Sequence, residues 1–288
     1  MFDPPPPQFA VSEFTTYPWS FEQDMESYSR LEVDAIEVCE FKLDQQHVIE
    51  QLKLIGSCGL LISSVQPVIR TLFPSRSQPE PLALNDRMQR FRQTVESFGE
   101  HASGVPFVTN SGMPPNGNIQ EVFDSAAHEY RALADFAADR GAKIALEPLN
   151  PSIVNVESAI WTVEQAMRIV SAVDRPNFGI CLDLWNVWQN AGIDEEIKRA
   201  GDRIFVVQLS DWRIPRSYED RLIVGQGDIP FPSLLRAIHA SGYRGPYELE
   251  IFSNGVPDSL WKGDLERVIV ESRDGLVRAW REAFSQCP

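Results

Sequence analysis

The 288-residue sequence contains few cysteines and histidines, and none of its cysteines forms a CxxC pair. Cys39 and Cys181 lie inside apolar runs, where a thiol packs as a small hydrophobe, and Cys58 and Cys287 complete the set. This usage argues against a disulfide framework and is typical of a reducing compartment. We therefore expect a cytoplasmic protein.

Basic residues and long apolar runs are also scarce. Lys and Arg number 26 against 41 Asp and Glu, which gives a formal net charge of −15. Such a surface repels phosphate backbones and argues against nucleic acid as a partner. No apolar run approaches the roughly 20 residues that span a bilayer, so we expect no membrane association. The first residues, MFDPPPPQF, lack the basic and apolar regions of a secretory signal, and their prolines predict a stiff lead-in over residues 1–8.

The rest of the chain alternates short apolar runs with longer amphipathic stretches. The clearest stretch, Ile119–Arg140, places Val122, Ala126, Tyr130 and Leu133 on one helical stripe. The apolar runs predict buried strands, namely FAVSEFTT, AIEVCEF, GLLISSV, PFVTNSG, KIALEPLN, FGICLDLW, IFVVQLS and YELEIF. The other predicted helices are Phe21–Leu31, Gln45–Cys58, Asp86–Ala102, Val163–Val173, Ile193–Ala200, Pro232–Ser241 and Leu265–Phe284.

Eight strands that are each followed by a helix predict a single (β/α)8 TIM barrel over residues 1–288. A doubly wound open sheet is the alternative, but it normally carries a glycine-rich first turn, and the sequence has no GxGxxG motif. The longer connections that follow strands would leave one face of the barrel. That face is where barrels of this kind place their functional residues.

Polar side chains follow the apolar part of the last four predicted strands. They are Glu147 in ALEPLN, Asp183 in CLDLWN, Gln208 in VVQLSD and Glu250 in YELEIF. In a barrel these ends surround one half of the mouth, and three carboxylates with one amide oxygen suit Mg²⁺, Mn²⁺ or Zn²⁺. Glu248 shares a strand face with Glu250 and is the alternative ligand. We favour Glu250 because it lies nearer the strand end.

At these residues the chain resembles the xylose isomerase-like barrel superfamily of sugar isomerases, epimerases and inosose dehydratases. The resemblance covers nearly the whole chain through LEPLN, LDLWN, VQLSDW, RLIVGQGDIPF and GYRGPYELEIF. It implies that Glu147, Asp183, Gln208 and Glu250 hold one divalent ion, and that Glu147 and Glu250 also act as acid and base. It further implies a sugar or polyol substrate and a homodimer.

Two positions depart from the ketose 3-epimerase branch of that superfamily. Gln208 stands where a histidine is usual, as in some dehydroshikimate dehydratases, and an amide oxygen favours Mn²⁺ or Mg²⁺ over Zn²⁺ or Co²⁺. Asn186 replaces a second histidine and cannot carry a proton. Asn150 matches a substrate-side asparagine of the epimerases, although it could equally be a turn residue before Pro151.

The histidines also separate branches of the superfamily. Its abasic-site endonucleases bind three metals through several histidines. Here the four histidines lie in or beside predicted helices, so we expect no such site; they are His47, His101, His128 and His239.

Aromatic and basic residues after the sixth and seventh predicted strands are candidates for the pocket wall. Trp185, Trp188 and Trp212 could cover the apolar face of a sugar ring, although Trp188 equally fits core packing. Arg221 could contact a substrate oxygen or pair with a nearby acidic residue.

The sequence is compatible with three functions. The first is a metal-dependent sugar or cyclitol isomerase or epimerase, and the second is a dehydratase of inosose or 3-dehydroshikimate type. The third is a barrel that binds a polyol without catalysis, a reading that Asn186 keeps open.

Overall fold

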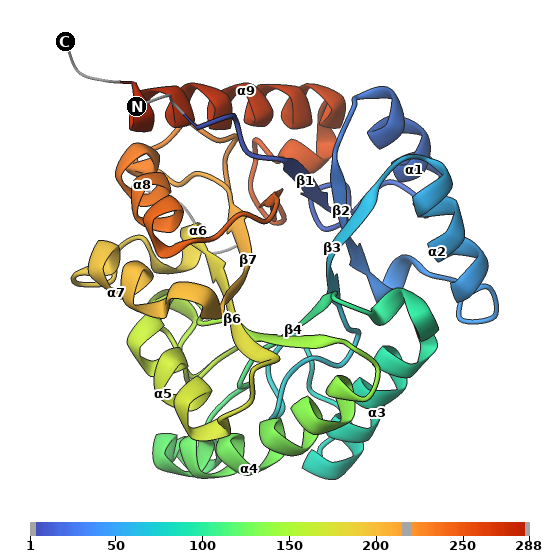
Figure 1. Cartoon of the computed structure of the whole chain (residues 1–288), viewed down its shortest axis with the longest axis vertical. Helices are drawn as coiled ribbons and strands as arrows, with labels where there is room; N and C mark the ends of the chain where they lie inside the picture. The colour runs from blue at the N-terminus through green and yellow to red at the C-terminus, as the bar shows by residue number, and fades with distance from the viewer. Residues whose placement is uncertain (1–3, 215–219, 286–288) are drawn as a thin grey trace.

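In the computed structural model, which describes residues 4–214 and 220–285, parallel strands close into a barrel surrounded by helices (Figure 1). Each strand pairs with the next along the chain, and β8 pairs with β1. The single (β/α)8 TIM barrel predicted from the alternating pattern is confirmed. The strands are β1 (Phe9–Ser12), β2 (Ala35–Cys39), β3 (Leu61–Gln66), β4 (Pro106–Thr109), β5 (Lys143–Leu146), β6 (Phe178–Asp183), β7 (Ile204–Leu209) and β8 (Tyr247–Leu249).

The helices form the outer layer of the barrel. The helices of the described residues are α1 (Phe21–Arg30), α2 (Val48–Ser57), α3 (Leu84–Ser97), α4 (Ile119–Ala138), α5 (Val163–Val173), α6 (Leu184–Val187), α7 (Ile193–Ala200), α8 (Phe231–Ser241) and α9 (Leu265–Phe284). The bounds of α5, α7 and α9 are those predicted from the sequence. The short helix α6, which begins directly after β6, was not predicted.

Several predicted elements are longer than those observed, and two of them end early for a clear structural reason. The first strand ends at Ser12 rather than continuing to Thr16, because Thr15 N–H donates to the Ser12 carbonyl (2.8 Å) and begins a turn. The helix predicted over Asp86–Ala102 ends at Ser97. Gly99 then adopts a left-handed φ of 53°, which an α-helix does not allow, and the chain continues as a 3₁₀ turn.

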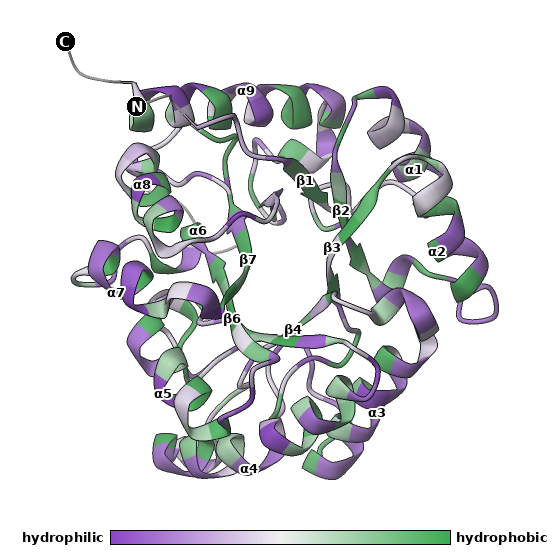
Figure 2. Ribbon diagram, in the orientation of Figure 1, coloured by the Kyte–Doolittle hydropathy of each residue, from purple (hydrophilic) through white to green (hydrophobic). Residues whose placement is uncertain are grey.

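The main apolar core lies between the strands and the helices. Figure 2 shows strands coloured mainly as hydrophobic and outer helices that mix hydrophobic and hydrophilic residues. Inside the barrel, a small apolar cluster consists of Val108, Ala145, Cys181 and Val206. The barrel interior also holds buried polar groups, because Glu37 on β2 is hydrogen-bonded to a residue of the non-adjacent strand β7.

The described part of the proline-rich lead-in packs beside the last helix, where Trp280 Nε1 donates to the Pro4 carbonyl (3.2 Å). Cys39, Cys58 and Cys181 are free thiols, and Cys287 lies outside the described residues. Among the helices that the structure describes, none is long and apolar enough to cross a membrane.

Candidate metal centre

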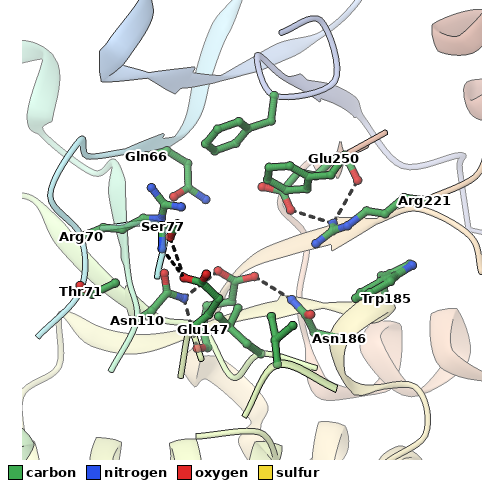
Figure 3. Close-up of a pocket in the computed structure, with 15 residues that line it drawn as sticks. Gln66, Arg70, Thr71, Ser77, Asn110, Glu147, Trp185, Asn186, Arg221 and Glu250 are labelled. Atoms are coloured by element: carbon green, nitrogen blue, oxygen red, sulfur yellow. Dashed lines mark hydrogen bonds and ion pairs between the residues drawn. The ribbon is translucent and has the colours of Figure 1, made fainter. Parts of the chain in front are cut away.

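Three buried carboxylates meet at the mouth of the barrel. Glu147 directly follows β5, Asp183 is the last residue of β6, and Glu250 directly follows β8. Each offers an oxygen within 4.8 Å of the others (Glu147 and Glu250 are labelled in Figure 3). We call these three residues the carboxylate triad. The triad places Glu250, and not Glu248, beside the carboxylates of β5 and β6.

Arg221 is the buried cation that compensates part of this charge. Its Nη2 lies 2.9 Å from Asp183 Oδ2. Its Nη1 lies 2.8 Å from Glu250 Oε2 (Figure 3). The guanidinium also lies over the rings of Trp185 and Phe252, at 4.9 and 4.8 Å from their centroids. Arg221 therefore pairs with acidic residues of the mouth rather than with the adjacent Asp220, while Glu219, the other neighbour suggested by the sequence, lies outside the described residues. Its contact with a substrate oxygen stays a prediction.

Two asparagine side chains donate to the triad. Asn186 Nδ2 lies 2.9 Å from Glu147 Oε1 and 2.8 Å from Asp183 Oδ2. Its Oδ1 accepts the backbone N–H of Asn150 (2.9 Å), which turns the NH₂ group toward the carboxylates. Asn110, which follows β4, donates to Glu147 Oε2 (3.0 Å). Asn110 was not predicted, although a polar residue after the strand run PFVT is the same signal that identified the triad.

Burial raises the pKa of all three carboxyl groups of the triad, and repulsion between them adds to the shift for Glu147 and Glu250. Desolvation, followed by repulsion from Glu250 and Asp183, raises the pKa of Glu147 to about 8. Desolvation raises the pKa of Glu250 to about 7 although Arg221 opposes the shift, and desolvation also raises the pKa of Asp183. Carboxyls with such pKa values hold protons near neutral pH unless a cation takes their place.

Gln208 lies beside Asp183 in the strand register, but its amide is engaged within the barrel. Its Nε2 donates to Glu37 Oε1 (2.8 Å), and its Oε1 accepts a weak hydrogen bond from the Cys181 thiol (3.3 Å). Glu248, its neighbour in register on β8, has a pKa raised to about 7, mainly by desolvation. No local pattern in the sequence predicts that Glu37, 171 residues away, contacts Gln208.

The other predicted site residues divide into two groups. Trp185 and Asn186 line the pocket above the triad. Asn150 instead caps a short turn, because its Oδ1 accepts the Ser152 N–H (3.0 Å). Trp212 packs against Trp188, with ring centroids 5.5 Å apart.

The pocket above the triad opens into a wider groove. The inner pocket is lined by Asn110, Glu147, Leu149, Trp185, Asn186, Arg221 and Glu250, among others. The outer groove is lined by Tyr17, Phe41, Pro67, Val68, Gln78, Asn254 and Trp261. Phe14, Gln66, Arg70, Ser77 and Phe252 line both. Gln66 and Arg70 were not predicted, because the end of β3 carries no acidic residue that would have drawn attention to it.

A closed barrel with oxygen-bearing side chains at the ends of its last strands defines a TIM barrel with a candidate cation site. The model of the xylose isomerase-like TIM barrel family matches residues 26–278. The chain belongs to that family.

Similar proteins include an L-ribulose 3-epimerase of Methylomonas sp. (strain DH-1), 30% identical over 215 residues, 73% of this chain and 69% of its own length. A 3-dehydroshikimate dehydratase of Pseudomonas putida (strain KT2440) is 33% identical over 135 residues, 44% of this chain. That match spans about a fifth (20%) of the dehydratase. Among solved structures, the IOLI protein with a binding zinc atom superposes with a TM-score of 0.79 at 23% identity, over 97% of this chain and 100% of that one. This structural likeness concerns the fold.

Proposed function

We propose that the protein is a divalent-metal-dependent isomerase or epimerase of a sugar or cyclitol. The carboxylate triad carries the proposal, because three buried acidic groups within 4.8 Å of one another have a single buried arginine to compensate them. The similarity to an L-ribulose 3-epimerase supports the same class of reaction.

The residues present fit a divalent cation. Glu147, Asp183 and Glu250 would supply carboxylate oxygens, and Gln208 would supply the amide oxygen of a fourth ligand. The Glu37 carboxylate fixes Gln208 Nε2 and so distinguishes the two ends of the amide, while the thiol that meets Oε1 is a weak donor and readily displaced. All oxygen donors favour Mn²⁺ or Mg²⁺, with Zn²⁺ or Co²⁺ as alternatives.

A bound cation would polarise the substrate carbonyl and so acidify the neighbouring C–H group. The chain itself supplies the groups that move the proton. Glu147 directly follows β5, Glu250 directly follows β8, and both line the inner pocket. Without a cation their pKa values are about 8 and 7, and a bound cation would lower both, so that each is ionised and can accept a proton at neutral pH. One glutamate removes the proton from carbon, and the other returns a proton to the opposite face.

Asn186 would bind substrate rather than transfer a proton. It occupies the inner pocket and donates to two carboxylates, and an amide has no proton to lose near neutral pH. In this mechanism the two glutamates therefore carry every proton transfer to carbon.

Deuterium exchange tests the proposal. Metal-loaded protein is incubated in D₂O with a panel of ketoses and inososes, and incorporation of deuterium at carbon is followed by NMR. Exchange without loss of water is the expected result. Absence of exchange with every compound would contradict the proposal and favour a barrel that only binds polyols.

Glu147→Gln serves as the matched variant in this assay. It removes a ligand and a proton-transfer group, so we expect exchange to fall by roughly 10²- to 10⁴-fold and bound metal, measured by elemental analysis, to decrease. Glu195→Gln, an exposed carboxylate on α7 that pairs with Lys198, should match wild type in both measurements. Undiminished metal in Glu147→Gln would contradict the proposed site.

A dehydratase is the second candidate, and the similarity to a 3-dehydroshikimate dehydratase favours it. The same glutamates would remove a proton next to the carbonyl, and a β-hydroxyl would leave as water. The NMR experiment separates the two candidates when 3-dehydroshikimate is added to the panel, because a dehydratase yields an unsaturated product.

A further inference from the structure

Arg70 lies at the junction of the inner pocket and the outer groove, and among the described residues its guanidinium has no polar partner. It lines both cavities and lies over the Phe14 ring, 5.6 Å from the centroid, but in residues 4–214 and 220–285 its guanidinium has no hydrogen bond or ion pair. The positive charge of Arg70 interacts with the Glu250 carboxylate and opposes the rise in the pKa of that group. Arg221, by contrast, pairs through Nη1 and Nη2 with Glu250 and Asp183 of the triad.

Three hydrogen bonds fix the backbone of Arg70 at the edge of the pocket. The Arg70 carbonyl accepts hydrogen bonds from Thr109 Oγ1 (2.7 Å) and Asn110 N (3.0 Å). Its N–H donates to Gln78 Oε1 (3.0 Å). These bonds fix the Cα position beside the β4 end, and the guanidinium extends toward the pocket (Figure 3).

Gln66, the last residue of β3, adds a second unpartnered polar group at the same place. It is only 3% exposed, and its side-chain Oε1 has no hydrogen-bond partner in the described part of the chain. A buried amide left unpaired costs free energy unless a ligand completes its hydrogen bonds. The nearby rim hydroxyl of Ser77 is already used, because it donates to Glu157 Oε2 (2.6 Å).

We infer that Arg70 and Gln66 form a subsite for a carboxylate group on the substrate. This inference rests on the proposed function and narrows its substrate class to polyhydroxy keto acids, with the carbonyl end at the triad and the acidic end at the junction. The guanidinium fork of Arg70 suits the two oxygens of a carboxylate. The unpartnered Gln66 Oε1 is an acceptor and suits a hydroxyl next to that carboxylate.

The charges of the site favour a carboxylate over a phosphate. A divalent cation and Arg221 together would balance the three carboxylates of the triad, so Arg70 would be the positive charge that faces the substrate. Glu157 lines the same pocket and offsets part of that charge. A carboxylate brings one negative charge to this place, whereas a phosphate dianion would bring two and would be repelled more strongly by Glu157.

Three compounds that differ only at C6 test the subsite: D-fructose, D-fructuronate and D-fructose 6-phosphate. Their affinities for the metal-loaded protein are measured by isothermal titration calorimetry. We expect the wild type to bind the acid roughly 10- to 100-fold more tightly than the neutral sugar, as a charge-assisted hydrogen bond provides. The phosphate should bind less tightly than the acid.

Arg70→Met retains the apolar stem over Phe14 and leaves no buried partner unpaired, so it should fold and retain metal. We expect it to abolish the preference for the acid while the affinity for fructose changes by less than about threefold. Gln66→Leu removes an acceptor for a substrate hydroxyl, so it should weaken the binding of acid and sugar alike and leave the preference unchanged. Arg30→Met, which removes an exposed arginine paired with Glu266 on α9, is the matched control and should retain it.

Failure to bind the acid, equal binding of acid and sugar by the wild type, or an unchanged preference in Arg70→Met would each overturn the inference. Tighter binding of the phosphate would overturn the assignment to a carboxylate. Deuterium exchange measured on the same samples separates the two proposals: an Arg70-dependent preference without exchange refutes the isomerase proposal alone, and exchange without the preference refutes the subsite alone.

Discussion

If Gln208 is the proposed fourth ligand, a partner far away in sequence orients its side chain for that role. The two ends of the amide are similar in size and differ in whether they donate or accept. Glu37 accepts from Nε2, so the amide oxygen is the end left with only a thiol as a partner. A carboxylate behind a metal ligand is a common way to fix that ligand's orientation.

The first prediction concerns this residue. Gln208→Leu removes the proposed fourth ligand, so we expect divalent-metal affinity to fall by roughly 10- to 100-fold, measured by titration calorimetry with Mn²⁺. Cys181→Ser is the control, because it changes only the weak donor to Oε1 and should leave the affinity close to wild type. Wild-type affinity in Gln208→Leu would remove Gln208 from the ligand set.

Among the elements, the segment after β7 matters most for the site, because it delivers Arg221. Residues on both sides of Arg221 join the neighbouring loops through short antiparallel bridges, Asp211 with Leu222 and Asp220 with Ser253. Helix α9 packs directly on this segment at Gly275. A Cβ at Gly275 would lie 2.0 Å from the Val224 carbonyl oxygen, so the close contact requires glycine.

The second prediction follows from this contact. In Gly275→Ala the helix and the segment must separate, and we expect a loss of about 1–3 kcal/mol in the free energy of unfolding, measured by urea denaturation. Displacement of Arg221 should also lower the rate of deuterium exchange. Gly56→Ala in α2 is the control, because nothing lies within 4 Å of the added Cβ. That substitution should stabilise the protein by about 0.5–1 kcal/mol.

At the scale of the whole molecule, the acidic mouth links stability to pH and to metal. The pKa of Glu147 is raised from 4.5 to about 8, and that of Glu250 to about 7. In the unfolded chain these groups lose their protons near their ordinary pKa. The stability that comes from holding protons is therefore present at low pH and is lost as the pH rises through 7 to 8.

The third prediction is that, in the presence of a chelator, this pair of glutamates lowers the free energy of unfolding between pH 6 and pH 8.5. Over the same range the stabilisation by added Mg²⁺ should increase, because the cation binds the deprotonated carboxylates. Urea unfolding with and without Mg²⁺ at both pH values measures the effect. Glu147→Gln should show a smaller dependence on pH than Glu195→Gln. A dependence equal in the two variants would contradict this origin.

Much of the fold was predictable because local patterns govern it. Strand runs and amphipathic stretches alternate so regularly that the bounds of α5 and α9 were predicted to the residue. The triad was predictable for a related reason, since parallel strands in a closed barrel deliver their carboxyl ends to one rim. The metal-ligand roles, the homodimer and the cytoplasmic location stay predictions.

The sequence by itself determined that oxygen-bearing side chains would gather at the barrel mouth, because strand polarity and order suffice for that. Only the tertiary structure decided which polar groups pair with one another: Arg221 bridges Asp183 and Glu250, Glu37 accepts from Gln208, and Arg70 has no ion pair within the part of the chain that the structure describes. These pairings join non-adjacent strands and loops, and they depend on how the closing barrel orients each side chain in three dimensions. No local pattern of residues contains that information.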